Sequence, residues 1–147
     1  MKNIKILIVL FFVSVIGQAS AQYRTGDDEL NRSLVRIDAE AKVDFGAFKV
    51  RIGRDFEISS KKLDNLSVAV GMSAGDIYMS VKVAKITNRN IDEVVKVYTA
   101  NKNKGWGVMA KELGIKPGSP EFHALKGNTK GKNKSKGKSN GKGKSKH

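Results

Sequence analysis

The apolar residues at the start of the folded region repeat at the spacing of one helical face. Steps of three or four residues place side chains on the same side of an α-helix. The series is Leu30, Leu34, Ile37, Ala41, Phe45, Phe48 and Ile52. It predicts a long first helix over roughly residues 28–55. A polar lead-in over residues 22–27 precedes it, and the acidic Asp27 and Asp28 favour a helix N-terminus there.

The end of that stretch also fits a different element. Val43, Phe45 and Ala47 alternate with other residues, which matches the two-residue period of a strand. Gly46 lies among them and lowers the stability of a helix by about 1 kcal/mol relative to alanine. A β-hairpin over residues 42–58 is therefore an alternative to continued helix.

Capping residues divide the rest of the folded region into shorter helices. Helices are expected over about residues 59–70, 74–86, 91–100, 108–113 and 120–126, with start signals at Ser73, Asn90 and Ser119. Ser73 is followed three residues later by Asp76, which resembles a capping box. Gly114 and Ile115 predict a C-cap in which the glycine ends the helix and the isoleucine packs back on it.

These elements predict an all-α fold. The expected architecture is a small irregular bundle of five or six helices that forms one domain over residues 28–126. The first helix is the longest and is expected to pack across the shorter ones, because short helices gain most of their stability from tertiary packing.

The N-terminal residues have the pattern of a signal peptide. Two lysines precede a nearly unbroken apolar run over residues 6–17, and small residues follow at Ala19 and Ala21. The run is shorter than the ~20 residues that cross a bilayer, so no transmembrane anchor is expected. The sequence predicts a signal peptide over residues 1–21 and an exported protein, periplasmic or extracellular. The chain has no cysteine, which excludes disulfides and a lipid anchor through that residue.

The C-terminal segment, residues 127–147, combines lysine with glycine, serine and asparagine and has no acidic residue. Its eight lysines are Lys130, Lys132, Lys134, Lys136, Lys138, Lys142, Lys144 and Lys146. Because the segment has nothing apolar to bury, it cannot offset the entropy lost on ordering. We therefore expect a disordered cationic tail of low sequence complexity.

The net charge of the chain, +14, is concentrated in that tail. The signal peptide holds two lysines and the tail eight, which leaves +4 on residues 22–126. Lysines act as point charges that neutralise phosphates without reading sequence. The predicted partners are polyanions: cell-envelope phosphates, extracellular nucleic acid or acidic polysaccharide. The alternative is a solubilising tail without a fixed partner.

The stretch KGWGVMAKELGIKPGSPEFHALK, residues 104–126, resembles a segment near the C-terminus of uncharacterised exported bacterial proteins of about this size. The resemblance rests on the pattern KGWGxxAKxLGIKPGSxEFH. That family has no assigned activity. The resemblance thus implies a helical module of similar size and no particular chemistry.

Trp106 is the one residue of the folded region that could add an aromatic contact to the lysines. It lies between two glycines, with Lys104 and Lys111 nearby, and could stack on a base or sugar while the lysines hold phosphate. The alternative is that this sole tryptophan anchors the core, and we favour that interpretation.

The sequence predicts no catalytic, cofactor or metal site. The only histidines are His123 and His147, and Glu121 lies two residues from His123, a spacing that points the two to different sides of a helix. We therefore expect a non-catalytic exported protein that binds polyanions through its tail. The alternative is a structural or protein-interaction module of the cell envelope, in which the helical domain carries the specificity.

Overall fold

The computed structural model describes residues 23–127. Within that range the regular structure is helical throughout, with seven α-helices and one π-helical segment. The elements are α1 (Asp28–Val43), α2 (Phe45–Phe56), α3 (Ser60–Asp64), the π-helical η2 (Asn65–Ala69), α4 (Ala74–Thr87), α5 (Ile91–Asn101), α6 (Trp106–Glu112) and α7 (Pro120–Gly127). The all-α prediction is confirmed, and the expected number of five or six helices is too low. The predicted signal peptide and the eight tail lysines lie outside the described residues.

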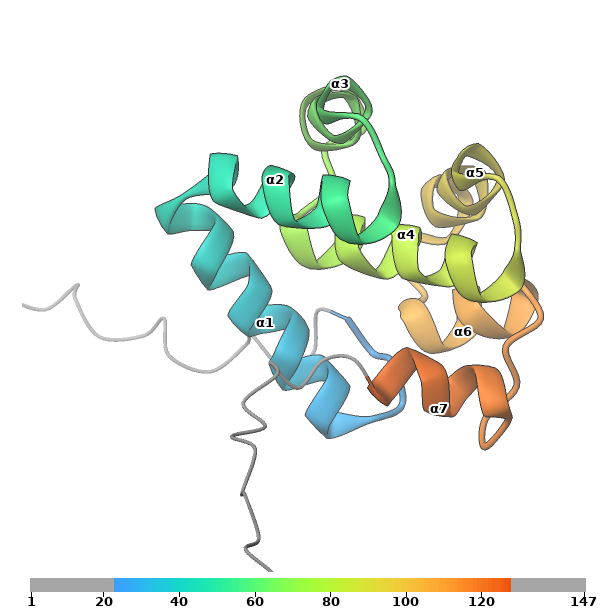
Figure 1. Ribbon diagram of the computed structural model, residues 1–147. Helices are drawn as coiled ribbons and strands as arrows, with labels where there is room; N and C mark the ends of the chain where they lie inside the picture. The colour runs from blue at the N-terminus through green and yellow to red at the C-terminus, as the bar shows by residue number, and fades with distance from the viewer. Residues whose placement is uncertain (1–22, 128–147) are drawn as a thin grey trace, which may run out of the picture.

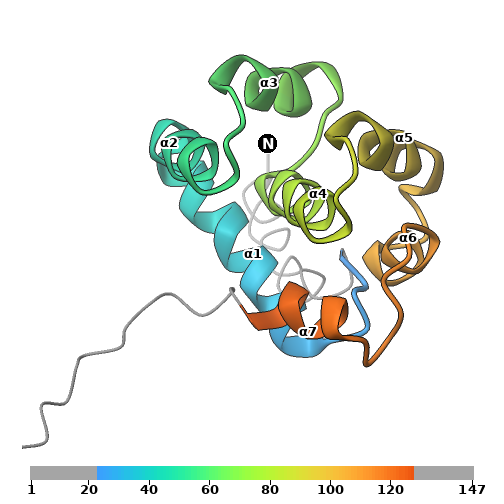
Figure 2. The same cartoon turned by 45° about the vertical axis from the view of Figure 1, so that its right-hand side comes forward.

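Helix α4 is the centre of the fold (Figure 1). It contacts α1, α2, α5, α7 and η2, and the other helices lie around it when it is viewed nearly along its axis (Figure 2). Every residue from Ala74 to Ala84 except Asp76 is buried. A helix that is apolar on all sides belongs in the interior of a protein. Ser80 and Lys82 are its buried polar exceptions.

The predicted long first helix is two helices that meet at Asp44, so the single helix over 28–55 is wrong. Asp44 has an extended backbone, φ −148° and ψ 92°, and its carboxylate accepts a hydrogen bond of 2.9 Å from the amide of Ala47. This side chain caps the start of α2 while the chain turns.

The alternative hairpin over 42–58 is also wrong, because α1 and α2 cover nearly all of that stretch. The alternating apolar residues that suggested strands belong to the end of α1 and the start of α2. Val43 is 88% exposed at the end of α1, whereas the rings of Phe45 and Phe48 stack with centroids 5.5 Å apart in α2.

The predicted caps are present. Ser73, Asn90 and Ser119 accept hydrogen bonds from amides in the first turns of α4, α5 and α7. After α6, Gly114 has φ +96° and its amide donates to the Lys111 carbonyl at 3.1 Å. The amide of Ile115 donates to the Ala110 carbonyl at 2.8 Å, which completes a Schellman motif. In residues 23–127, no helix has both the length and the hydrophobicity of a membrane span.

Candidate functional site

The structure separates the three residues of the folded region that the sequence grouped as a contact site. Lys104 and Lys111 are exposed, whereas Trp106 is only 1% exposed. The faces of the indole are therefore covered by protein, which favours the core interpretation of this tryptophan over stacking on a ligand.

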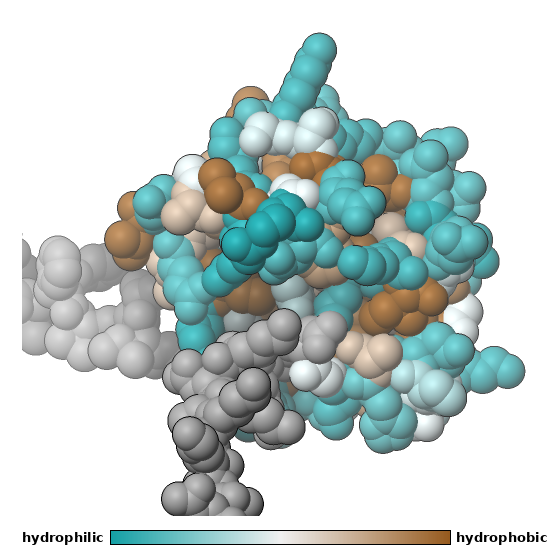
Figure 3. All heavy atoms as spheres, in the orientation of Figure 1, coloured by the Kyte–Doolittle hydropathy of each residue, from teal (hydrophilic) through white to brown (hydrophobic). Residues whose placement is uncertain are grey.

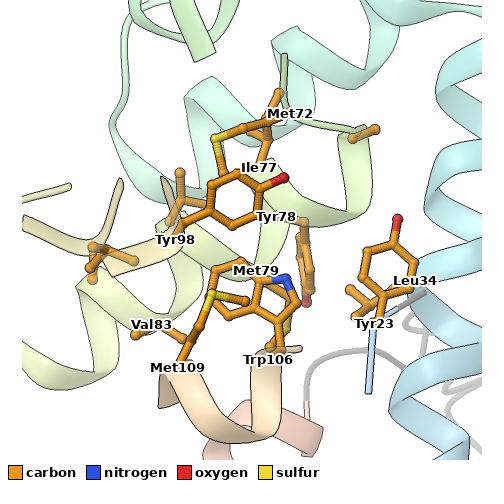
Figure 4. Packing of buried hydrophobic residues seen from close by; sticks show 14 of the residues in the cluster. Tyr23, Leu34, Met72, Ile77, Tyr78, Met79, Val83, Tyr98, Trp106 and Met109 are labelled. Carbon is orange, nitrogen blue, oxygen red and sulfur yellow. The ribbon is translucent and has the colours of Figure 1, made fainter. Parts of the chain in front are cut away.

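Trp106 begins α6, and its ring lies among buried hydrophobic and aromatic side chains, Tyr98 among them (Figure 4). Its Nε1 donates to Oδ1 of Asp76 at 2.8 Å. Its ring stacks on Tyr98 of α5, with centroids 5.8 Å apart. The indole thus joins α6 to both α4 and α5.

Asp76 is the centre of this cluster. Besides the indole, its carboxylate accepts the hydroxyl of Tyr98 at 2.9 Å and the hydroxyl of Ser73 at 3.0 Å. Three side-chain donors therefore face one half-buried carboxylate. Hydrogen bonds to a charged acceptor are stronger than those between neutral groups.

A second carboxylate, that of Asp38 in α1, extends the cluster. It accepts the amide of Gly75 at 2.8 Å and the hydroxyl of Tyr23. The Tyr23 hydroxyl also lies 2.9 Å from the hydroxyl of Ser73. The two carboxylates are thus linked through hydroxyl groups, and the chain of contacts joins residue 23 to α1, α4, α5 and α6.

The two tyrosines of the cluster keep their protons. Burial raises the pKa of Tyr23 far above its ordinary value, and the hydrogen bond to Asp38 adds to the effect. Burial likewise raises the pKa of Tyr98, followed by the negative charge of Asp76. Both phenols therefore remain hydrogen-bond donors at physiological pH.

A pocket of about 320 Å³ lies against this cluster. It is lined by Gly71, Ser73, Asp76, Tyr98, Lys102, Gly105, Trp106 and Met109. Asp76 already accepts three donors here, and Lys102 donates to the Val70 carbonyl at 3.2 Å with its ammonium 5.4 Å from the Tyr98 ring centre. The polar groups of the wall therefore hold helices together. We call the linked side chains the polar hub: Tyr23, Asp38, Ser73, Asp76, Tyr98 and Trp106.

Glu121 and His123 are both exposed on α7, and among residues 23–127 no three His, Asp or Glu side chains are grouped closely enough to hold a metal ion.

The surface of the described domain mixes charges of both signs. All fourteen acidic residues of the chain lie within it, against eighteen lysines and arginines. Several are paired: Lys49 with Asp64 at 2.7 Å, Arg51 with Glu40 at 3.2 Å, and Lys126 with Asp27 at 2.5 Å. Figure 3 shows mainly hydrophilic side chains on one face, with hydrophobic ones in separate spots. The domain thus offers polyanions much less net charge than the tail does.

Sequence reasoning missed most of the hub. The spacing of Ser73 and Asp76 indicated a cap, but nothing in the sequence connected that cap with Tyr23, Asp38 or Tyr98. The one available signal was Tyr23 itself, a large aromatic residue inside a stretch that was interpreted as a polar lead-in.

Comparison with known proteins gives no match for this chain. No protein-family model matches it, and neither does any curated protein or solved structure. Residues 104–126, which carry the resemblance described above, form α6, α7 and their connection. The resemblance remains a prediction.

Proposed function

We propose that this protein is an exported, non-catalytic protein that associates with polyanions through its lysine-rich tail. The observation that carries the proposal is the division of charge. Eight lysines without an acidic residue follow residue 127, whereas acidic and basic side chains in the domain nearly balance and several form ion pairs. The partners of this chemistry are cell-envelope phosphates, extracellular nucleic acid or acidic polysaccharide.

The tail binds by releasing counterions. Each lysine that neutralises a phosphate on duplex DNA displaces condensed cations, so the affinity falls as salt rises. If all eight lysines make such contacts, log affinity falls with log salt at a slope of about −7. The domain contributes a folded unit in which the polar hub joins residue 23 to α1, α4, α5 and α6.

The test compares the mature chain with a version that ends at Lys126. Binding to heparin and to a DNA duplex is measured by fluorescence anisotropy at several salt concentrations. We expect the full chain to give the steep salt dependence and the shortened chain to lose most of its affinity.

Two variants of unchanged length serve as controls. Replacement of the eight tail lysines by glutamine should abolish binding, and replacement by arginine should preserve it, since the charges act without fixed geometry. A slope shallower than about −2 for the full chain would contradict the proposal. If the version that ends at Lys126 still binds isolated cell envelope, recognition belongs to the helical domain instead.

A further inference from the structure

Tyr23 and Thr25 anchor residues 23–26 in the core, whereas Arg24 and Gly26 are exposed. Tyr23 is 0% exposed and Thr25 5%. The carbonyls of Tyr23 and Arg24 accept the amides of Trp106 and Gly107 at 2.7 Å and 2.9 Å. The first amides of a helix have no partner within it, and α6 has no side-chain cap. The N-terminal segment therefore supplies the acceptors that start α6.

Two helices leave space for this segment by carrying glycine. A Cβ atom on Gly75 of α4 would collide with the phenol of Tyr23. A Cβ atom on Gly107 of α6 would lie 3.0 Å from the Arg24 carbonyl oxygen, a tighter contact than most Cβ atoms make, so the Arg24 backbone would have to move by a few tenths of an ångström. The surroundings of residues 23–26 are thus fitted to the Tyr23 side chain and to the backbone of Arg24 and Thr25. We call these four residues the N-terminal latch.

The latch begins two residues after the predicted cleavage site. Cleavage there is a hydrolysis: water adds across the Ala21–Gln22 amide bond and leaves a carboxylate on Ala21 and an ammonium on Gln22. Extended peptides are bound through hydrogen bonds along their main chain, and we expect the peptidase to hold residues on both sides of that bond in this way. Two residues span at most about 7 Å, so the enzyme needs the backbone at Tyr23, whose carbonyl is already bonded to α6.

We infer that closure of the N-terminal latch and removal of the signal peptide exclude each other, so that cleavage after Ala21 has to precede folding of the domain. This inference rests on the export that we propose. The folded precursor is cut only from the fraction of molecules in which the latch is open, and the cleavage rate follows that fraction.

Precursor variants test the inference without altering the cleavage site. Residues 1–147 are incubated with signal peptidase in detergent micelles, as wild type, Gly107→Ala and Gly75→Ala. In both variants the added Cβ atom lies on a helix and pushes against the latch, while the latch residues and the cleavage site keep their sequence. Gly127→Ala is the control, because a Cβ atom there meets nothing within 4 Å. Circular dichroism confirms that each precursor is helical.

We expect the two latch variants to be cut at least about tenfold faster than wild type and the control, which corresponds to weakening the latch by about 1.4 kcal/mol. Equal rates for all four precursors would overturn the inference.

A second measurement needs no signal peptide. Trypsin cleavage after Arg24 in the mature chain, followed by mass spectrometry, should accelerate by a similar factor in Gly107→Ala and not in Gly127→Ala. Acceleration there without faster signal-peptide removal would show that the latch does not control processing. The inference would also be overturned if the processed protein isolated from cells did not begin at Gln22. That result would leave the tail-binding test on purified protein unaffected.

Discussion

Asp76 shows how one side chain in the first turn of a helix can join several elements. Its carboxylate accepts donors from Ser73, Tyr98 and Trp106, and the last two are 22 and 30 residues away along the chain. A carboxylate offers about four acceptor positions, whereas an amide offers one oxygen and two N–H groups that would face other donors.

Asp76→Asn should therefore lower the free energy of unfolding by about 2–4 kcal/mol, since hydrogen bonds to a charged group contribute about 1.5–3 kcal/mol each and some are retained by the amide. Urea unfolding followed by tryptophan fluorescence measures the change. Asp92→Asn is the matched control. Asp92 also lies in the first turn of a helix, but its side chain is 61% exposed and pairs with Lys62, so its loss should cost less than about 1 kcal/mol. Equal losses for the two variants would contradict the role of Asp76 as a hub.

The sequence predicted the local part of this cluster and not the rest. Ser73 and Asp76 could be related because a cap has a fixed spacing along the chain. The contacts of Asp76 with Tyr98 and Trp106 depend on how α5 and α6 pack against α4, which no spacing encodes.

At the scale of elements, the corner at Asp44 is the main departure from what the sequence predicted. The apolar positions continue at helical spacing from Ala41 to Phe45 because α1 and α2 both pack against α4. The apolar stripe is therefore continuous although the chain changes direction. Caps were predicted well because they depend on neighbouring residues, and the central place of α4 was missed although its lack of a polar face indicated it.

Asp44→Ala should lower the free energy of unfolding by about 1 kcal/mol, the usual effect of losing an N-cap side chain. Far-UV circular dichroism during urea unfolding measures it. Asp55→Ala in α2 is the control, because Asp55 is exposed and pairs with the exposed Arg54. An unchanged midpoint for Asp44→Ala would show that packing alone holds the corner.

At the scale of the whole molecule, stability depends on a lysine inside the core. Lys82 is 3% exposed on α4, and its ammonium donates to the carbonyl of Leu125 in α7. Burial lowers the pKa of Lys82 to about 8 from the ordinary 10.5. Below pH 8 both states carry the charge, and the folded state bears the cost of burying it.

Stability should therefore rise as the pH increases from about 8 towards 10.5, where the unfolded chain holds the proton that the folded protein has released. The gain is on the order of 3 kcal/mol at most. Above about pH 10 the raised pKa values of Tyr23 and Tyr98 act in the opposite direction, because the unfolded chain then loses protons that the folded protein keeps. Urea unfolding midpoints at pH 7.5 and pH 9.5 measure the rise, because both pH values lie below the range in which the tyrosines act.

Lys82→Met should remove most of that rise while keeping the volume of the side chain. Lys85→Met, on the same helix, removes one exposed charge and should leave the rise intact. If stability still rises with pH in Lys82→Met, another titratable group causes the rise.

The ion pair between Lys126 and Asp27 has a consequence for orientation. It fixes the end of α7 beside the start of α1, whereas α3 lies at the opposite pole of the molecule (Figures 1 and 2). A surface that captured the tail would hold the protein by one pole and leave the other facing the medium. Val68, 84% exposed in η2, lies next to α3 in the chain. In a chain without cysteine, Val68→Cys provides a unique attachment point for a reporter directed away from such a surface.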